Sequence, residues 1–370
     1  MRDVLVIGGG LAGAAAAAHL ASARRDVLLL ERSAGPHDKV CGEFLSFEAQ
    51  EELGRLGIDL RALGAVPIDR AVMTCGRRRA ETPLGFDALS LSRRVLDEAL
   101  LARAQQTGAE VRRGRRTVAL LREGSGWTAG IEGGERLRAR HLILATGKHD
   151  LRGWKRPAGR QPDLLGLKMY WRPADPRRLE GRVELHLFPG GYAGLELVEG
   201  GRANLCLVIR QLAFANLGRR WDVLLAHLRS HCPDLAAQLD GAEPCAERPL
   251  AIARLPYGLM QADSDGVWRV GDQAAVIPSF TGEGMSIALH GARLAAAYLA
   301  AGRPPEEFQR RMARDLRGQV GRSTWVSQAL VKPGVQALGS RVLGPPLLRL
   351  GLWGTRIPEA ARARATSGLG

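Results

Sequence analysis

Two kinds of hydrophobic pattern divide the chain. The first is a continuous apolar run, which is typical of strands that are buried on both faces of a parallel sheet. Four such runs occur, at Val4–Ile7, Asp26–Leu30, His141–Ala145 and Val267–Gly271. The second kind has polar interruptions and glycine-rich turns, which predicts antiparallel strands. Three of these strands are expected, at Leu164–Trp171, Val183–Phe188 and Ala203–Ile209.

Helices and shorter strands are predicted between these runs. Five helices are expected, at Ala14–Ala23, Glu48–Gly57, Ser92–Thr107, Trp221–His231 and Gly284–Ala301. Short strands are expected at Glu110–Arg113, Thr117–Arg122 and Trp127–Ile131. The segment 66–91 should form several short strands because Pro67, Gly76, Pro83 and Gly85 interrupt it. From Arg311 onward the pattern is helical, apolar and basic, with breaks at Pro333, Pro345-Pro346 and Pro358.

The first turn of the chain carries a dinucleotide-binding motif. Gly8-Gly-Gly-Leu-Ala-Gly13 separates the first strand from the first helix, as the G-x-G-x-x-G motif requires. The glycines allow a tight turn and a close approach to a pyrophosphate, and the helix N-terminus offers N–H groups to it. Glu31 ends the second strand, where an acid binds a ribose 2′-hydroxyl and repels a 2′-phosphate. The unit therefore favours the adenosine of FAD or NAD over that of NADP.

A second motif lies late in the chain, where Gly271-Asp272 is followed by Pro278-Ser-Phe-Thr-Gly-Glu-Gly-Met285 and a long helix. Ser92-Arg-Arg-Val-Leu-Asp97 and Ala145-Thr-Gly147 lie between the two motifs. With these four elements in this order, the chain resembles the FAD-dependent oxidoreductases of the geranylgeranyl-reductase and aromatic-hydroxylase superfamily. The resemblance spans residues 1 to about 300, and it implies an α/β fold.

The two kinds of hydrophobic pattern imply the domain organisation. A Rossmann-like FAD-binding domain would comprise residues 1–65, 92–150 and 256–310. An interleaved antiparallel-sheet substrate domain would comprise 66–91 and 151–255, and a helical C-terminal region would comprise 311–370.

The family's FAD-binding residues can be carried over to matching positions. Asp272 would bind the ribityl chain, and Gly282–Met285 would lie against the isoalloxazine, with the following helix aimed at its N1–C2=O side. Arg93 would lie near the flavin side of the dinucleotide. The full predicted set is Gly8, Gly10, Leu11, Ala12, Gly13, Glu31, Arg32, Lys39, Cys41, Gly42, Arg93, Val118, Thr146, Gly147, Gly271, Asp272, Gly282, Gly284 and Met285.

The loop Lys39-Val-Cys-Gly-Glu-Phe-Leu-Ser46 resembles the C-G loop of the geranylgeranyl-reductase branch, where the cysteine faces the flavin. Cys41 is the candidate catalytic residue: Lys39 nearby would lower the pKa of its thiol, which would then serve as a proton donor or a polar contact. The alternative is a small buried thiol that packs as an apolar group.

Three departures from family patterns reduce the number of reactions and substrates that fit the sequence. Residues 145–152 lack the D-G-x-x-S-x-x-R motif of aromatic hydroxylases, including its NAD(P)H-handling Asp. The halogenase pattern W-x-W-x-I-P is absent, which argues against halogenation. Glu184 and His186 replace the Tyr and Trp of the polyprenyl-reductase pattern Y-x-W-x-F-P, which weakens the case for a prenyl chain.

These observations leave two reactions open. The preferred one is hydride transfer from reduced FAD to a C=C bond of a hydrophobic, polyketide- or isoprenoid-like small molecule. The alternative is NAD(P)H-dependent hydroxylation of an aromatic or polyketide substrate. NAD(P)H would be a transient electron donor in either case, because the chain has no second G-x-G-x-x-G. A more distant alternative is a non-catalytic flavin-binding protein that docks on a membrane or a nucleic acid.

Composition sets the remaining limits. An apolar fraction of 45% and a charged fraction of 25% exclude intrinsic disorder. Five scattered cysteines and no signal-like leader predict a reducing, cytoplasmic location. His227 and His231 have metal-ligand spacing beside Cys232, but no third ligand is evident, so we predict no metal site.

The net charge of +15 is concentrated near the C-terminus. Residues 310–364 hold 11 basic and two acidic side chains. No aromatic-interleaved basic strand or recognised nucleic-acid module is present, so no nucleic-acid partner is predicted. The mixture of Val, Leu, Trp353 and Arg in residues 330–353 resembles an interfacial helix, which leaves a peripheral membrane contact open. The oligomeric state has no signature in the sequence.

Overall fold

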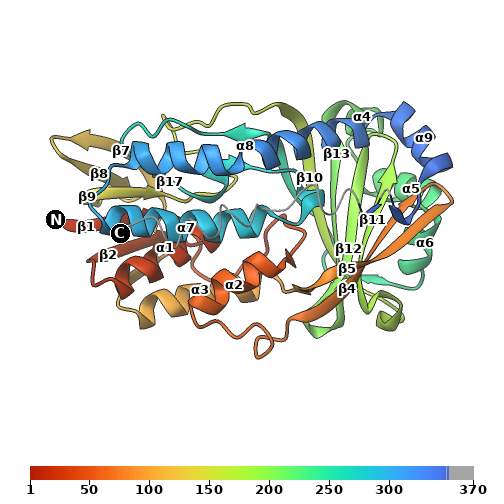
Figure 1. Ribbon diagram of the computed structural model, residues 1–370, viewed down its shortest axis with the longest axis horizontal. Helices are drawn as coiled ribbons and strands as arrows, with labels where there is room; N and C mark the ends of the chain where they lie inside the picture. The colour runs from red at the N-terminus through yellow and green to blue at the C-terminus, as the bar shows by residue number, and fades with distance from the viewer. Residues whose placement is uncertain (347, 350–370) are drawn as a thin grey trace.

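The computed structural model describes residues 1–346 and 348–349, and within them the chain forms two large sheets at opposite ends of the molecule (Figure 1). The first sheet has the strand order β6-β2-β1-β9-β8-β7, with β17 beside β9. Its members are β1 (Arg2–Ile7), β2 (Val27–Glu31), β6 (Glu110–Arg113), β7 (Thr117–Glu123), β8 (Gly126–Ile131), β9 (Arg136–Leu144) and β17 (Trp268–Arg269). Strands β6, β2, β1, β9 and β17 pair in parallel, as the continuous apolar runs predict.

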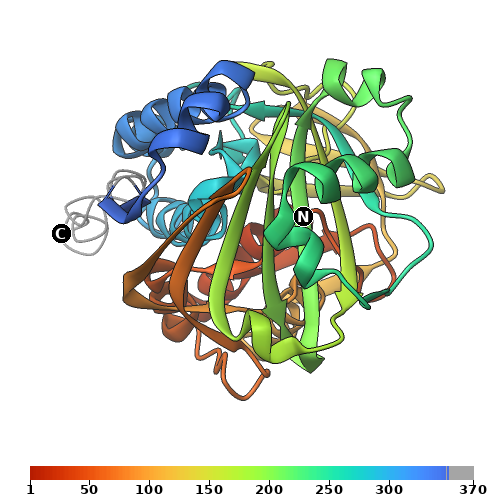
Figure 2. The ribbon, with the colours of Figure 1, turned by 90° about the vertical axis from the view of Figure 1, so that its right-hand side faces the viewer.

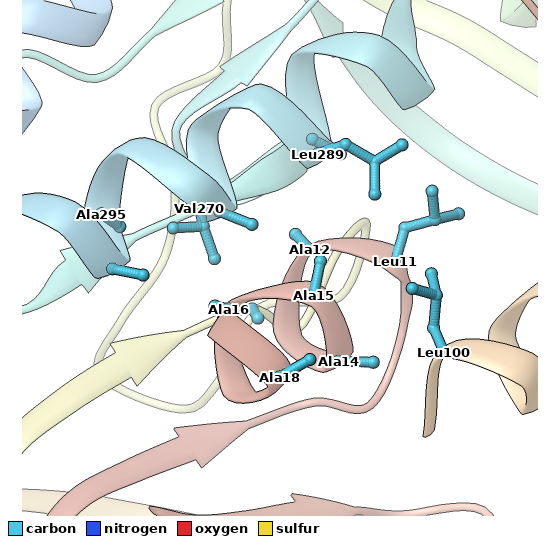
Figure 3. Packing of buried hydrophobic residues seen from close by; sticks show 14 of the residues in the cluster. Leu11, Ala12, Ala14, Ala15, Ala16, Ala18, Leu100, Val270, Leu289 and Ala295 are labelled. Atoms are coloured by element: carbon cyan, nitrogen blue, oxygen red, sulfur yellow. The ribbon is translucent and has the colours of Figure 1, made fainter. Parts of the chain in front are cut away.

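Three helices cover one face of this sheet through small side chains. They are α1 (Leu11–Ser22), α3 (Arg93–Gln106) and α7 (Gly284–Ala300). All five residues from Ala14 to Ala18 of α1 are fully buried, so alanine lets α7 and α3 approach the α1 backbone closely. Figure 3 shows this packing, with Leu289 and Ala295 of α7 on one side of α1 and Leu100 of α3 on another. Because the two helices pack against each other, the N-termini of α1 and α7 are held in fixed positions relative to each other.

The second sheet is mainly antiparallel and has the order β14-β10-β13-β12-β11-β4-β5-β3, with β15 also paired to β10. Its strands are β3 (Phe44–Leu45), β4 (Val66–Cys75), β5 (Arg78–Ser90), β10 (Gln161–Arg172), β11 (Gly181–Phe188), β12 (Gly191–Val198), β13 (Arg202–Arg210), β14 (Glu243–Pro244) and β15 (Leu250–Tyr257). Its outer face carries α5 (Trp221–His231) and α6 (Pro233–Gln238), which lie in front of it in Figure 2. The predicted α/β fold with an interleaved antiparallel sheet is confirmed.

Further helices flank the two sheets, and α8 joins both ends. They are α2 (Phe47–Arg55), α4 (Gln211–Asn216), α8 (Pro305–Leu330) and α9 (Pro333–Val342). Helix α8 contributes Phe308 and Val320 to the core beside the parallel sheet, while Leu330 at its end packs against the core of the other sheet. The boundary expected at residue 310 therefore falls inside one continuous helix.

Short elements complete the described chain. They are β16 (Leu259–Met260), β18 (Ala275–Val276), and the 3-10 turns η1 (Pro176–Leu179), η2 (Glu199–Gly201), η3 (Gly271–Gln273) and η4 (Ser279–Thr281). Within the described residues, no helix is long and apolar enough to cross a membrane. The break expected at Pro358 and the last part of the basic segment, from residue 350 onward, lie outside those residues, so the membrane contact stays a prediction.

Several predictions about strands differ from the structure. Residues 66–91 form one long hairpin, β4–β5, rather than several short strands, because only Gly76 lies in a turn. Pro83 is accommodated within β5, next to a register shift in the ladder. Strand β12 was not predicted, since Gly191 and Gly194 obscure its alternation.

Candidate functional site

A cavity of about 670 Å³ lies between the carboxyl ends of β1 and β9 and the inner face of the antiparallel sheet. Every predicted cofactor-binding residue lines it, with the single exception of Gly13. Residues that sequence reasoning missed also line it, among them Val40, Glu43, Lys148, Gly166, Cys206, Tyr257 and Ser279. The two motifs, more than 250 residues apart, therefore meet around one space.

The glycines of the first motif have different tasks. A Cβ atom on Gly8 would lie 2.4 Å from the Ala145 carbonyl oxygen, and one on Gly13 would lie 1.9 Å from the Gly8 carbonyl oxygen. These two glycines therefore let the turn, β9 and α1 touch. Gly10 differs, because a Cβ atom there would face Lys39 Nζ at 3.3 Å and Arg93 Nη2 at 3.4 Å. That atom would point into the cavity, between two cations.

The charged groups around this turn are held in place by two acids. Asp97 accepts from Lys39 Nζ at 2.6 Å and from Arg93 Nε at 2.8 Å. Glu31 accepts from the backbone N–H groups of Gly9 at 2.7 Å and Ser33 at 2.9 Å. Burial would raise the pKa of Glu31, but these N–H groups hold it below its ordinary value. Glu31 is thus an ionised acid at the cavity wall.

The late motif forms the other end of the cavity. Gly271 and Gly282 have left-handed backbones, with φ of 60° and 72°, and a Cβ on Gly282 would lie 2.5 Å from the Phe44 ring. Asp272 lines the cavity, and its backbone carbonyl accepts from Arg156 Nη1 at 3.0 Å. Helix α7 begins at Gly284 without a side-chain cap, so its first N–H groups are available to a ligand.

These residues fit FAD. The uncapped N-terminus of α1, with Lys39 and Arg93 beside it, would bind the pyrophosphate, and Glu31 would accept from the adenosine ribose. Asp272 would bind the ribityl chain, and the start of α7 would face the ring carbonyl where negative charge develops on reduction. The cavity thus offers cations and N–H groups where FAD carries phosphate, and an acid where it carries hydroxyls.

Cys41 lines the cavity and is partly buried. Lys39, the predicted cationic neighbour, pairs with Asp97, and the Arg93 guanidinium lies close enough to the Cys41 thiol to interact with it electrostatically. The thiol also accepts from the Glu43 backbone N–H at 3.4 Å. A cation therefore does lie beside Cys41, but it comes from α3.

A buried polar cluster behind Cys41 escaped sequence reasoning. Lys168 Nζ lies 2.6 Å from Glu43 Oε1, and both side chains are fully buried. Tyr170 donates to Glu43 Oε2 at 2.7 Å, and the Arg93 backbone N–H donates to Glu43 Oε1 at 2.7 Å. Burial raises the pKa of Glu43, and Lys168 offsets part of that shift. Only the alternation of β10, which puts Gly166, Lys168 and Tyr170 on one face, hinted at this cluster.

Glu196 joins the cluster from β12 and gives it a pH dependence. Its Oε1 accepts from Asn204 Nδ2 at 2.8 Å. Burial and the nearby Glu43 raise the pKa of Glu196 from 4.5 to about 8. Between those pH values the folded protein holds a proton that the unfolded chain has released, so rising pH lowers the stability of the fold.

We therefore expect Glu196→Gln to remove this loss of stability, because the amide is neutral at every pH and still accepts from Asn204. The variant and the wild type should melt together near pH 5, and the variant should melt about 5 °C higher at pH 9. Thermal melting of the two proteins across this range makes the comparison. If the difference in melting temperature between the two proteins were the same at every pH, the assignment of a proton to Glu196 would be contradicted.

Two other residue pairs from the sequence lie away from the cavity. Glu184 and His186 do not line it: His186 Nδ1 contacts Thr74 Oγ1 at 2.7 Å, and Glu184 accepts from Gln238 of α6 at 3.3 Å. Their difference from the polyprenyl-reductase pattern therefore leaves the cavity wall unchanged. The His227 and His231 rings lie 4.2 Å apart, yet among the described residues no group of three potential ligands could hold a metal.

Comparisons with known proteins agree with this geometry. Residues 1–156 match the family model described as an FAD binding domain. A menaquinone reductase of Mycolicibacterium smegmatis is 30% identical over 329 residues, covering 81% of this chain and 76% of that protein. Digeranylgeranylglycerophospholipid reductase 1 of Methanopyrus kandleri is 31% identical over 316 residues, covering 79% of each chain. A rifampicin monooxygenase of Streptomyces venezuelae is 29% identical, over 50% of this chain and 38% of that protein.

Solved structures share the fold across almost the whole chain. A flavoprotein/dehydrogenase from Cytophaga hutchinsonii superposes with a TM-score of 0.79 at 17% identity, covering 98% of this chain and 95% of that one. This likeness concerns the fold, whereas the sequence relatives concern the family. Taken with the glycine-rich turn, the acid and the two uncapped helix N-termini around one cavity, these matches show that the chain belongs to the FAD-dependent oxidoreductase family that includes the menaquinone and digeranylgeranylglycerophospholipid reductases.

Proposed function

We propose that this oxidoreductase reduces a C=C bond of a hydrophobic, isoprenoid- or polyketide-like small molecule, with NAD(P)H as the transient electron donor. One observation carries the proposal: the space that fits FAD is continuous with an apolar space against the antiparallel sheet. Phe44, Val208, Ile252, Leu255 and Val276 line that inner end. An apolar substrate placed there would lie next to the flavin ring and away from water.

Similarity to reductases supports this choice over hydroxylation. The two reductase relatives each align over more than three quarters of both chains. The monooxygenase relative aligns over half of this chain. The missing Asp of the hydroxylase D-G motif points the same way.

Cys41 is the residue that we propose as the proton source. FAD, when bound and reduced, supplies a hydride to an organic acceptor. The hydride would form a C–H bond at one carbon of the double bond, and the thiol proton of Cys41 would form a C–H bond at the other. The thiolate that remains would be stabilised by Arg93 and then reprotonated from water.

The positive charge around the cavity is the basis for the proposed electron donor. Arg32, Arg115, Arg116 and Arg152 line the cavity, so one rim of it is strongly basic. A nicotinamide dinucleotide carries at least two negative charges, and it would be attracted to this rim while it reduces the flavin. The donor could then leave before the apolar substrate reacts.

The test is an anaerobic turnover assay with the FAD-loaded protein. NADH, NADPH or dithionite would supply electrons to mixtures that contain a polyprenyl quinone, a polyprenyl glycerol ether or a phenolic polyketide. We expect a product that is heavier than its substrate by two hydrogen atoms, formed without oxygen. A product that appears only in air and carries label from ¹⁸O₂ would make the protein a monooxygenase and overturn the proposal.

Cys41→Ser should lower kcat about 100-fold in that assay, because an alcohol is a far weaker acid than a thiol. FAD binding should be unchanged, since the serine adds no bulk at the cavity wall. Cys245→Ser is the matched control, because Cys245 is exposed and does not line the cavity. Equal activity of both variants would remove the proton-donating role of Cys41 without affecting the assignment of the reaction.

A further inference from the structure

The loop that carries Cys41 is held by its backbone carbonyls. Lys148 Nζ donates to the Val40 carbonyl oxygen at 2.6 Å, and the Leu91 backbone N–H donates to that of Glu43 at 3.2 Å. Between them, one side chain holds both remaining carbonyls: Asn204 Nδ2 donates to Cys41 O at 3.1 Å and to Gly42 O at 3.0 Å. Four successive carbonyls are thus fixed by groups from three distant parts of the chain.

This loop needs such support. Glu43 has a left-handed backbone with φ of 62°, which is uncommon for a residue with a side chain. A Cβ atom on Gly42 would meet no atom within 4 Å, so the loop has open space beside it rather than packing. Without its hydrogen bonds the segment would relax toward more favourable backbone angles, and Cys41 would move with it.

The orientation of the Asn204 amide is determined by its neighbours. Nδ2 lies within hydrogen-bond distance of three oxygen atoms, those of Cys41, Gly42 and Glu196. If the amide were flipped, its oxygen would face the carbonyl oxygens of Cys41 and Gly42 and repel them. Asn204 is fully buried, and Glu196 is its direct cross-strand partner on β12. The sheet therefore presents a donor of fixed orientation to the loop.

We propose that Asn204 is a positioning residue, which fixes the Cys41–Gly42 segment at the flavin side of the cavity and couples it to the substrate-facing sheet. Glu196 orients the Asn204 amide, and the ion pair of Glu43 with Lys168 anchors the loop's far end. This inference rests on the proposed function only for the importance of Cys41. Whether Asn204 holds the loop in position can be measured without an assay of turnover.

The test measures how fast each cysteine reacts with N-ethylmaleimide, by digestion and mass spectrometry of quenched samples. Exposed Cys245 serves as the internal reference in every sample. In Asn204→Ala, we expect the Cys41 rate relative to Cys245 to rise at least tenfold, because the released loop exposes the thiol. In turnover, kcat should fall while KM stays within twofold.

The matched control is Gln336→Ala. Gln336 is also buried and also donates from one amide nitrogen to three carbonyls, those of Phe188, Gly191 and Leu330, but it lies away from the cavity. Gln336→Ala should lower the melting temperature of the protein about as much as Asn204→Ala does, and it should leave the reaction rate of Cys41 unchanged. An unchanged Cys41 rate in Asn204→Ala, or an equal rise in both variants, would overturn the proposal.

A second variant covers the case in which Asn204→Ala does not fold. Glu196→Ala removes only the acceptor that orients the amide, so the Cys41 rate should rise about threefold. A rate that stays at the wild-type value would also overturn the proposal. If the rates change as expected but no acceptor is reduced, the positioning role stands and the proposed reaction fails.

Discussion

Replacement of Glu43 by alanine is expected to lower the free energy of unfolding by about 3–5 kcal/mol. The change would leave the Lys168 ammonium fully buried, with the Tyr170 hydroxyl at 2.9 Å as its remaining hydrogen-bond partner. It would also remove the acceptor of the Arg93 backbone N–H at the start of α3. Chemical unfolding of the FAD-free variant and wild type, followed by circular dichroism, measures the difference.

The double variant Glu43→Gln with Lys168→Met is the control for this explanation. It removes both charges, keeps an acceptor for Tyr170 and retains nearly the same volume, and such replacements of buried ion pairs are often neutral. Most of the lost stability should therefore return. If the double variant is as unstable as Glu43→Ala, packing rather than an unpaired charge explains the loss.

Replacement of Gly10 by valine should abolish FAD binding and leave the fold intact. Gly10 has φ of −77° and ψ of −174°, which is extended backbone that valine adopts readily. The new side chain would occupy the space between Lys39, Arg93 and the first N–H groups of α1, where the pyrophosphate would lie. We expect at least a 100-fold loss of FAD affinity, measured by the change in flavin fluorescence on titration.

Gly13→Ala is the contrasting variant within the same motif. Its Cβ atom would overlap the Gly8 carbonyl oxygen, so the turn itself must move. Melting of the FAD-free protein should therefore fall by several degrees in Gly13→Ala and stay near wild type in Gly10→Val. The opposite result would mean that the two glycines have been assigned the wrong tasks.

Local patterns predicted the fold well where a single element carried the signal. The apolar runs of β1, β2 and β9 and the helix expected from Ser92 to Thr107 are present. The polar first half of β9, residues 136–140, was missed because its arginines are exposed to solvent, so the segment pairs with β8 without forming an apolar run. Pro83 suggested a strand end, yet the hairpin accommodates it. Such accommodation depends on the partner strand, which no local window contains.

The same distinction explains which residues of the site could be predicted from the sequence. Gly8 and Glu31 could be predicted to line the site because a dinucleotide imposes fixed spacings on the turn and strand end that bind it, and Asp272 could be predicted from the family resemblance. The partners Glu43, Lys168, Glu196 and Asn204 come from separate strands and a loop, and nothing in their spacing indicates that they meet. Arg93 illustrates both cases: the family resemblance predicted it for the cofactor site, and it lines the cavity, while its proximity to Cys41 depended on the fold.

The strand order has a consequence for synthesis of the protein. Val4 of β1 pairs with Val27 on one side, but on the other side it pairs with His141, which the ribosome adds much later. At ordinary elongation rates this delay is on the order of ten seconds. During this delay, the edge of the apolar strand β1 that will pair with β9 has no partner. The alanine face of α1 that will pack against α7 is also exposed. We expect the newborn N-terminal segment to require chaperone protection until β9 and α7 have emerged.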